Sequence, residues 1–421
     1  MLRKLAFAGA ALATVVASIV PAVQPAQAAT GFSVSNGRLL DANGNDFVMR
    51  GVNHAYAWYK ERDSSFADIK RTGANTVRVV LDLNVSAGEI TTIINLCRTN
   101  RLICMLEIHN TTGYGDSGGG NATLAQAADF WVSRRSVLTG QERYVLINIG
   151  NEPLGNNNAG NWTSSTTGAI RTIRNAGLQH TLVVDGPNWG QDWSNTMRSN
   201  APSVFAADTL RNTVFSIHMY GVYGQAATIN NYLNAFISAR LPIIVGEFGN
   251  NHSDGDVDEN TIMATAQQKG IGYLGWSWSG NGSPVEYLDM TNGFNAASLT
   301  AWGQRIINGA NGIRATSREA SVYGGTTNPT TPPVGGGTAP NGFPYCASAG
   351  SDPDGDGWGW ENSQSCVVRG GRADTGSTPT SPATAPNGFP YCASAGSDPD
   401  GDGWGWENSA SCVLRGGRAD H

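Results

Sequence analysis

The chain has 421 residues, of which only 14% are charged, with 54 glycines and 12 each of Trp, Tyr and Phe. This length is sufficient for one large domain with accessory units. The formal net charge is −6 and no basic stripe runs along the chain, which argues against nucleic-acid binding. Low charge and many aromatic residues are instead typical of an exported protein that handles neutral, ring-shaped ligands.

Residues 1–28 have the pattern of a secretory signal peptide. Arg3 and Lys4 form a short basic start, an apolar run covers 5–20, and Ala26-Gln27-Ala28 fits the small-x-small cleavage pattern. The run is too short for a membrane span, and no stop-transfer charges follow it. We therefore expect cleavage after Ala28, a secreted, extracellular, monomeric protein with no membrane or nucleic-acid partner, and paired cysteines.

Residues 29–323 alternate apolar runs with helix-like stretches. A hairpin is predicted over 32–45, and eight apolar runs follow at 47–53, 76–82, 103–110, 144–152, 181–186, 214–220, 242–249 and 272–280. Eight such units predict an α/β fold of the (β/α)8 TIM-barrel type, which typically takes about 250 residues. A doubly wound open sheet is the alternative, but residues 51–55 lack the Gly-rich phosphate loop typical of that fold.

Two of these runs end in a carboxylate. Glu152 follows the dense apolar run 145–149, and Glu247 follows the run 243–245. A parallel barrel places its catalytic groups at the carboxyl ends of its strands. One strand-end Glu alone is readily explained as a helix cap, whereas two on separate strands are the minimum equipment for cleaving a glycosidic bond.

Polar and aromatic residues stand at the other run ends: Arg78, His109, Asn151, His218, Tyr220, Trp276 and Trp278. Strand residues two apart share a face, so His218 with Tyr220, and Trp276 with Trp278, are expected to face the barrel mouth. Arg78 alone would suit a fold-stabilising ion pair. Together, however, these residues are difficult to explain as packing.

Their chemistry suggests separate roles in glycoside cleavage. Arg78 and Tyr220 are suited to keep Glu247 ionised as the nucleophile. His218 is suited to tune Glu152, which must stay protonated until it acts as the acid. Asn151 is suited to bind the sugar hydroxyl next to the reacting carbon, and Trp278 offers an apolar face for a pyranose ring.

In this order, these residues resemble glycoside hydrolase family 5. The resemblance implies a (β/α)8 barrel of retaining enzymes, with Glu152 as acid/base and Glu247 as nucleophile. Residues 185–193, 246–256 and 276–282 further resemble bacterial β-mannanases of this family. This implies internal cleavage of β-1,4-mannan, glucomannan and galactomannan, with substrate contacts at His109, Trp189, Trp276 and Trp278.

Two alternatives remain open. An endo-β-1,4-glucanase (cellulase) would use the same fold, because the orientation of one hydroxyl separates glucose from mannose. A non-catalytic polysaccharide-binding protein is a different class, and the presence of both carboxylates with their supporting residues argues against it.

Further features of the first unit have weaker signals. An acidic stretch after the seventh run could hold a structural calcium ion or form a solvated helix cap, although catalysis itself requires no cofactor; its residues are Asp254, Asp256, Asp258 and Glu259. Cys97 and Cys104 are predicted to form a disulfide because the chain is exported. His54 is expected either to line the site or to pack under the hairpin.

The tail is repetitive. A linker at 324–338 precedes a first module at 339–374, and a second linker at 375–384 precedes a second module at 385–421. The repeated segments, 338–374 and 384–420, differ only at Gln364 versus Ala410 and Val368 versus Leu414. Units this short need covalent staples, so we expect the bridges Cys346–Cys366 and Cys392–Cys412.

Each module carries a Trp-Gly-Trp motif whose indoles, at a period of two, can form a flat ligand surface; the residues are Trp358, Trp360, Trp404 and Trp406. The modules resemble family 10 carbohydrate-binding modules, which implies binding to cellulose or plant cell wall. They have one disulfide apiece where that family has two, and protein docking is the alternative. Residues 352–357 open like a calcium loop, but Ser363 stands where the loop's final Glu belongs.

Overall fold

The computed structural model describes residues 31–324 and, in the tail, residues 339, 345–346, 358–361, 364–368, 404–407 and 410–413. The chain divides into two units, residues 1–328 and 329–421. The predicted signal peptide and most of both linkers lie outside the described residues. No described helix is long and apolar enough to cross a membrane.

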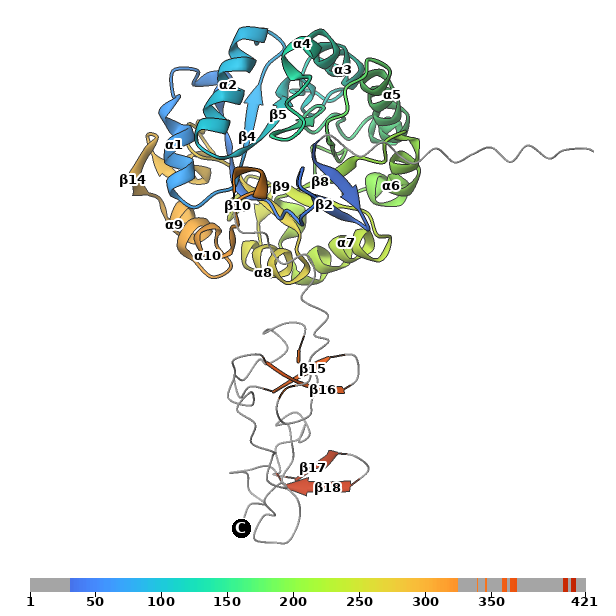
Figure 1. Ribbon diagram of the computed structural model, residues 1–421, viewed down its shortest axis with the longest axis vertical. Helices are drawn as coiled ribbons and strands as arrows, with labels where there is room; N and C mark the ends of the chain where they lie inside the picture. The colour runs from blue at the N-terminus through green and yellow to red at the C-terminus, as the bar shows by residue number, and fades with distance from the viewer. Residues whose placement is uncertain are drawn as a thin grey trace, which may run out of the picture. The chain divides into compact units, whose positions relative to one another are not determined.

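The first unit is a closed barrel of eight parallel strands, as predicted (Figure 1). The strands neighbour one another in chain order, and the last, β12, closes the barrel against the first, β3. They are β3 (Arg50–His54), β4 (Thr76–Leu81), β5 (Ile103–Ile108), β6 (Val145–Asn148), β7 (Leu182–Asp185), β8 (Thr213–Met219), β9 (Ile243–Phe248) and β12 (Gly272–Gly275).

Helices surround the barrel (Figure 1). They are α1 (Ser64–Arg71), α2 (Ala87–Thr99), α3 (Leu124–Ser133), α4 (Arg135–Leu138), α5 (Trp162–Asn175), α6 (Thr196–Ala207), α7 (Ala226–Ser238), α8 (Glu259–Lys269), α9 (Ala301–Asn308) and α10 (Ile313–Thr316). Capping boxes start two of them, with Ser86 and Glu89 before α2 and Thr123 and Gln126 before α3.

Short elements occupy the loops. The single-turn 3-10 helices are η1 (Tyr56–Trp58), η2 (His109–Thr111), η3 (Ala159–Asn161), η4 (Gly221–Tyr223), η5 (Glu286–Leu288) and η6 (Ser321–Tyr323). The paired short strands are β1 (Ser33–Ser35) with β2 (Arg38–Leu40), β10 (Asn251–His252) with β11 (Gly255–Asp256), and β13 (Thr291–Asn292) with β14 (Asn295–Leu299).

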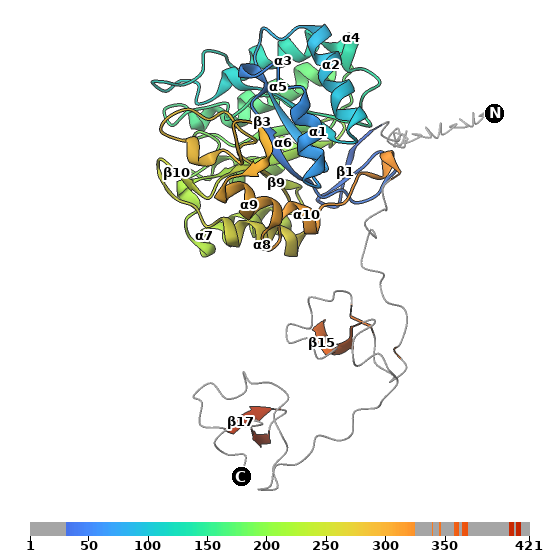
Figure 2. The same cartoon turned by 90° about the vertical axis from the view of Figure 1, so that its left-hand side faces the viewer.

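The core explains why the strands read as continuous apolar runs. Every residue of the eight barrel strands is buried, because the barrel interior covers one face and the helices cover the other. The predicted hairpin is β1–β2, whose turn has positive φ at Asn36 and Gly37, as a type I′ turn requires. Figure 2 shows β1 and β10 at opposite ends of the barrel.

His54, at the end of β3, packs inside the protein and does not line the cleft. Its side chain is fully buried, and neither ring nitrogen has a hydrogen-bond partner. Its ring meets those of Tyr56, Phe66 and Phe294 edge-on, with centroids 6.1, 5.4 and 6.4 Å away. Because burial disfavours the charged imidazolium, the pKa of His54 falls to about 4.

The expected bridge between Cys97 in α2 and Cys104 in β5 is not formed in the structure. Both are buried free thiols, with their sulfur atoms 2.7 Å apart. A disulfide needs about 2.05 Å between sulfurs, so this pair is joined by a hydrogen bond instead. Burial, followed by the contact with Cys104, raises the pKa of the Cys97 thiol.

Each tail module contains one antiparallel hairpin. These are β15 (Trp358–Glu361) with β16 (Gln364–Val367), and β17 (Trp404–Glu407) with β18 (Ala410–Val413). Both have the same register, since Trp358 lies opposite Val367 and Trp404 lies opposite Val413.

The first module contains the expected Cys346–Cys366 disulfide. In the second module Cys412 is disulfide-bonded, while Cys392 lies outside the described residues. The Trp404 side chain is 38% exposed, and the side chains of Trp358, Trp360 and Trp406 are outside the described part of the chain.

The burial of His54 predicts acid-sensitive stability of the barrel. Below its ordinary pKa of 6.5 the unfolded chain takes up a proton that the folded chain accepts only near pH 4, so stability is lost as the pH falls. We expect His54→Phe to reduce the loss in unfolding free energy between pH 7 and pH 4.5 by about 2 kcal/mol.

The measurement is urea unfolding of wild type and variant at both pH values. Any packing change caused by the larger ring affects both pH values alike, so only the pH dependence is compared. Equal pH dependence in the two proteins would contradict the prediction.

Candidate active site

A cleft of about 430 Å³ lies at the carboxyl ends of the barrel strands. The loops after the strands supply its walls, as the parallel arrangement requires. It is lined by His109, Thr112, Asn151, Glu152, Trp189, Gln191, Tyr220, Glu247, His252, Ser253, Trp276, Val285 and Leu288.

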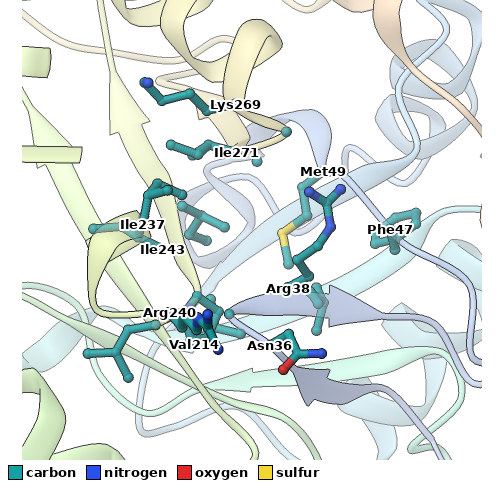
Figure 3. A pocket seen from close by; sticks show the side chains of 17 residues that line it. Asn36, Arg38, Phe47, Met49, Val214, Ile237, Arg240, Ile243, Lys269 and Ile271 are labelled. Carbon is teal, nitrogen blue, oxygen red and sulfur yellow. The ribbon is translucent and has the colours of Figure 1, made fainter. Parts of the chain in front are cut away.

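A second pocket, of about 180 Å³, lies against the amino-terminal ends of the strands (Figure 3). It is lined by the β1–β2 hairpin and by the starts of β8, β9 and β12, with Val214, Ile243 and Ile271 among its apolar residues. Its lining contains no carboxylate, so it lacks the groups that acid–base chemistry on a sugar requires.

Glu247, in β9, is held from two sides. Its Oε1 accepts a hydrogen bond from Arg78 Nη1 at 2.6 Å, and its Oε2 accepts one from the Tyr220 hydroxyl at 2.8 Å. Burial raises the pKa of Glu247, and the positive charges of His218 and Arg78 counter this rise. Both partners named for Glu247 from the sequence are therefore in contact with it.

Arg78, in β4, is completely buried and uses all five of its N–H donors. Its acceptors are Asn53 Oδ1, Asn148 Oδ1, Asn151 Oδ1, Asp185 Oδ2 and Glu247 Oε1. Although burial lowers it, the neighbouring charges of Glu107, Glu247 and Asp185 raise the pKa of Arg78. A permanent positive charge therefore lies under the cleft.

Glu152, after β6, lies beside an imidazole. His218 Nδ1 is 2.7 Å from Glu152 Oε1 and 3.5 Å from Glu247 Oε2. Glu152 itself has a φ of 40°, in the left-handed region that a non-glycine residue seldom occupies. Such a conformation costs about 1 kcal/mol or more, and it is typical of residues whose placement serves a function.

The two carboxylates approach each other closely. One oxygen of Glu152, one oxygen of Glu247 and a ring nitrogen of His218 all lie within 4.8 Å of one another. Two carboxyl groups about 5 Å apart suit attack by one of them on a sugar carbon, whereas a wider gap is needed to admit a water molecule between carboxylate and sugar. Among the described residues, these three also form the only cluster of metal-ligand type.

His109 and Trp276 form one wall of the cleft. Their rings stack at 5.8 Å with 20° between planes, and His109 Nδ1 lies 2.9 Å from Glu107 Oε1. Trp58 meets His109 edge-on at 5.2 Å and is 57% exposed. The sequence interpretation missed Trp58, which comes four residues after β3 in an aromatic segment that carries no further signal.

Trp278 does not reach the cleft, and the expectation that it faces the barrel mouth is wrong. It is fully buried in the core, while Trp276 lines the cleft. Strand β12 ends at Gly275, so the period-two rule that put both indoles on one face does not apply beyond that residue.

Asn151 and Trp189 both line the cleft and are both fixed by hydrogen bonds. Asn151 Oδ1 accepts from Arg78, and its Nδ2 donates to Thr112 Oγ1 at 2.8 Å. The Trp189 indole N–H donates to Asp116 Oδ2 at 3.0 Å. Gln191 and His252 also line the cleft, and the sequence interpretation gave neither of them a role.

The acidic stretch after β9 is engaged in protein contacts. Asp254 accepts hydrogen bonds from the Gln191 side chain and the Gly221 backbone, and Asp258 caps the start of α8. In the described part of the chain, its four acidic residues do not form a cluster of metal-ligand atoms. Calcium binding by this stretch stays a prediction.

The sequence matches two known families. Residues 40–282 match glycosyl hydrolase family 5 (Cellulase), and residues 336–368 and 381–414 each match a cellulose or protein binding domain. These ranges correspond to the barrel and to the two repeated segments of the tail.

The chain is similar to several mannan-degrading enzymes. It is 62% identical to a mannan endo-1,4-beta-mannosidase of Streptomyces lividans over 81% of this chain and 89% of the relative. It is 51% identical to one of Cellvibrio japonicus over 81% and 80%. A mannohexaose complex of Thermomonospora fusca beta-mannanase superposes with a TM-score of 0.68 at 55% identity, over 70% of this chain and all of that one. The chain belongs to glycosyl hydrolase family 5.

Proposed function

We propose that the barrel is an endo-β-1,4-mannanase that hydrolyses internal bonds of mannan, glucomannan and galactomannan with retention of configuration. The proximity of Glu152 and Glu247, within 4.8 Å oxygen to oxygen, is the observation that carries this proposal. The mannanase names of the relatives at 62% and 51% identity support the choice of substrate. Export by the predicted signal peptide would bring the enzyme to these polymers.

In the first step, the Glu247 carboxylate attacks the anomeric carbon, and the bond from that carbon to the leaving oxygen breaks. Glu152 donates its proton to the leaving oxygen, which departs as an alcohol. Arg78 and Tyr220 hold the two oxygens of Glu247, so its lone pairs point from a fixed carboxylate plane. The product is a glycosyl ester of Glu247.

In the second step, Glu152 acts as a base. It takes a proton from water, the resulting oxygen nucleophile attacks the anomeric carbon, and Glu247 leaves as a carboxylate. Two inversions at one carbon give net retention. His218 lies 2.7 Å from Glu152, which fixes the orientation of the carboxyl group for both proton transfers.

Around the reacting carbon, the cleft offers groups suited to a neutral sugar chain. Asn151 lines the cleft beside Glu152 and can meet the hydroxyl next to the reacting carbon. The stacked pair of His109 and Trp276 offers a ring surface with polar edges. Apolar faces with a few placed polar groups are the usual means of binding a pyranose.

Replacing Glu247 with Ala tests the nucleophile. We expect kcat on soluble mannan to fall by about 10⁴-fold or more, because no covalent intermediate can form. Added azide is then expected to restore cleavage and give a glycosyl azide of inverted configuration, since the small anion attacks from the vacated side. Product release and NMR of the anomeric proton provide the measurements.

The matched control for this variant is Glu142→Ala, which removes a buried carboxylate ahead of β6, at the opposite end of the barrel. It should retain full kcat. Wild-type assays on mannan, glucomannan, cellulose and xylan then test the substrate. Preference for cellulose would replace mannanase by glucanase, and inverted products from wild type would overturn the double displacement.

Removing the Tyr220 hydroxyl tests the support of the nucleophile. A hydrogen bond to a charged group contributes about 1.5–3 kcal/mol, so Tyr220→Phe should lower kcat/KM by about 10- to 100-fold. Loss of this donor also raises the pKa of Glu247, so the acidic limb of kcat/KM against pH should move to higher pH.

Tyr273→Phe is the control for that experiment. It removes another buried hydroxyl, which donates to the Asn311 carbonyl at 2.7 Å away from the cleft. It should leave the pH profile unchanged. A profile that is unmoved in Tyr220→Phe as well would show that this hydroxyl does not support the nucleophile.

For the tail, we propose that the two modules bind cellulose or plant cell wall and hold the barrel near its substrate. The family match and the exposed Trp404 support this. Two linked modules raise the effective affinity, because the second contact becomes intramolecular.

A comparison of three Trp→Ala variants tests this role: Trp358 with Trp360, Trp404 with Trp406, and all four together. Pull-down on crystalline cellulose should weaken in the first two and be lost in the third, with soluble mannan hydrolysis unchanged. Undiminished binding by the third variant would contradict the proposal. Binding that requires a cell extract would favour protein docking.

A further inference from the structure

Asp185, the last residue of β7, is a buried carboxylate to which neither the resemblance nor the mechanism above assigns a role. It is 1% exposed and does not line the cleft. Carboxylates are seldom buried unless partners compensate for the lost hydration. The identity of its partners therefore indicates what it does.

The Asp185 side chain contacts the supports of both catalytic carboxylates. Its Oδ2 accepts a hydrogen bond from Arg78 Nη2 at 3.2 Å and lies 3.3 Å from His218 Nε2. The same oxygen accepts from the backbone N–H of Glu152 at 3.3 Å. Its Oδ1 accepts from Asn148 Nδ2 at 3.0 Å. One side chain thus joins the neighbours of Glu247 to those of Glu152.

His218 has carboxylates at both ring nitrogens. Nδ1 faces Glu152 and Glu247, at 2.7 and 3.5 Å, and Nε2 faces Asp185. Only the doubly protonated ring can present N–H to both sides at once. Although burial lowers it, the charges of Glu247 and Asp185 raise the pKa of His218 to about 10.

The second partner of Asp185 is Arg78, which sets the position of Glu247. Asp185 and Asn151 take the two protons of Nη2, so Nη1 is left to Asn53 and Glu247. A guanidinium is planar, so fixing one of its ends also fixes the other. Asp185 therefore reaches the nucleophile through Arg78 and the acid/base through His218.

We propose that Asp185 is a positioning residue that keeps His218 as an imidazolium and fixes the Arg78 guanidinium, and thereby orients both Glu152 and Glu247 for the reaction. This role rests on the double displacement proposed above. Asp185 touches neither the substrate nor the reacting atoms.

Asp185→Asn is the variant of choice, because it keeps the shape of the side chain and removes its charge. His218 would then be neutral at working pH, and Glu247 would lose the nearby positive charge that favours its ionised form. We expect kcat to fall by about 10- to 100-fold with KM changed less than about threefold. The acidic limb of kcat/KM should rise by about half a pH unit.

The matched control is Asp208→Asn. Asp208 is an equally buried carboxylate whose two oxygens accept hydrogen bonds from Arg174, at 2.8 and 2.9 Å, in a pair outside the cleft. It should lower the melting temperature while leaving kcat and the pH profile of the folded protein unchanged. If Asp185→Asn behaves like Asp208→Asn, Asp185 is only structural and the inference is overturned.

A measurement on the wild-type chain keeps the test decisive if Asp185→Asn does not fold. Nitrogen-15 NMR of the imidazole rings, with His218 assigned by its absence in His218→Asn, should show both ring nitrogens protonated up to pH 8. A neutral His218 at pH 7 would overturn the proposal.

The kinetic comparison uses whichever β-glycan the wild type hydrolyses, so an error in the substrate does not affect it. Inverted products from wild type would defeat the proposed function, whatever the variant does. Retained products together with an unaltered pH profile in Asp185→Asn would defeat only the role of Asp185.

Discussion

The buried ion pair between Arg78 and Glu247 is the interaction on which both the barrel mouth and its chemistry depend. The guanidinium in β4 connects β3, β6, β7 and β9 through its hydrogen bonds, so it aligns their carboxyl ends. Such a pair adds little net stability when intact, but loss of one partner leaves a bare buried charge and costs about 3–5 kcal/mol. Fold and reactivity therefore share one constraint at this point.

The two catalytic carboxylates differ because their cationic neighbours differ. Glu247 contacts a guanidinium, whose charge is permanent at any pH the protein meets. Glu152 contacts an imidazole, whose charge depends on the groups around it. Two identical side chains can thus perform opposite tasks, one as a standing anion and the other as a group that gives and takes a proton.

Much of the barrel and its site could be predicted from the sequence for definite physical reasons. Parallel strands buried on both faces read as continuous apolar runs, and their carboxyl ends meet at one rim, so residues such as Arg78 and Tyr220 could be grouped before any coordinates were known. Nothing comparable marks Asp185, because a strand-end carboxylate reads the same whether it faces the cleft or lies beneath it.

Other features depend on details that a pattern does not contain. Trp278 lies in the core because β12 stops at Gly275, and strand ends are the least predictable part of a strand. Cys97 and Cys104 do lie together, as a helix end and the next strand should, but a fraction of an ångström separates a shared proton from a bond. Neighbourhood could be predicted here, and bonding could not.

The left-handed backbone of Glu152 has a consequence for engineering of this barrel. Glycine adopts such a φ without steric cost, so replacing Glu152 with Gly would relieve backbone strain while removing the proton donor. Selection for heat resistance alone would therefore favour inactive proteins at this position. A screen for hardier variants must demand turnover in every round, because here durability and reactivity are opposed within a single residue.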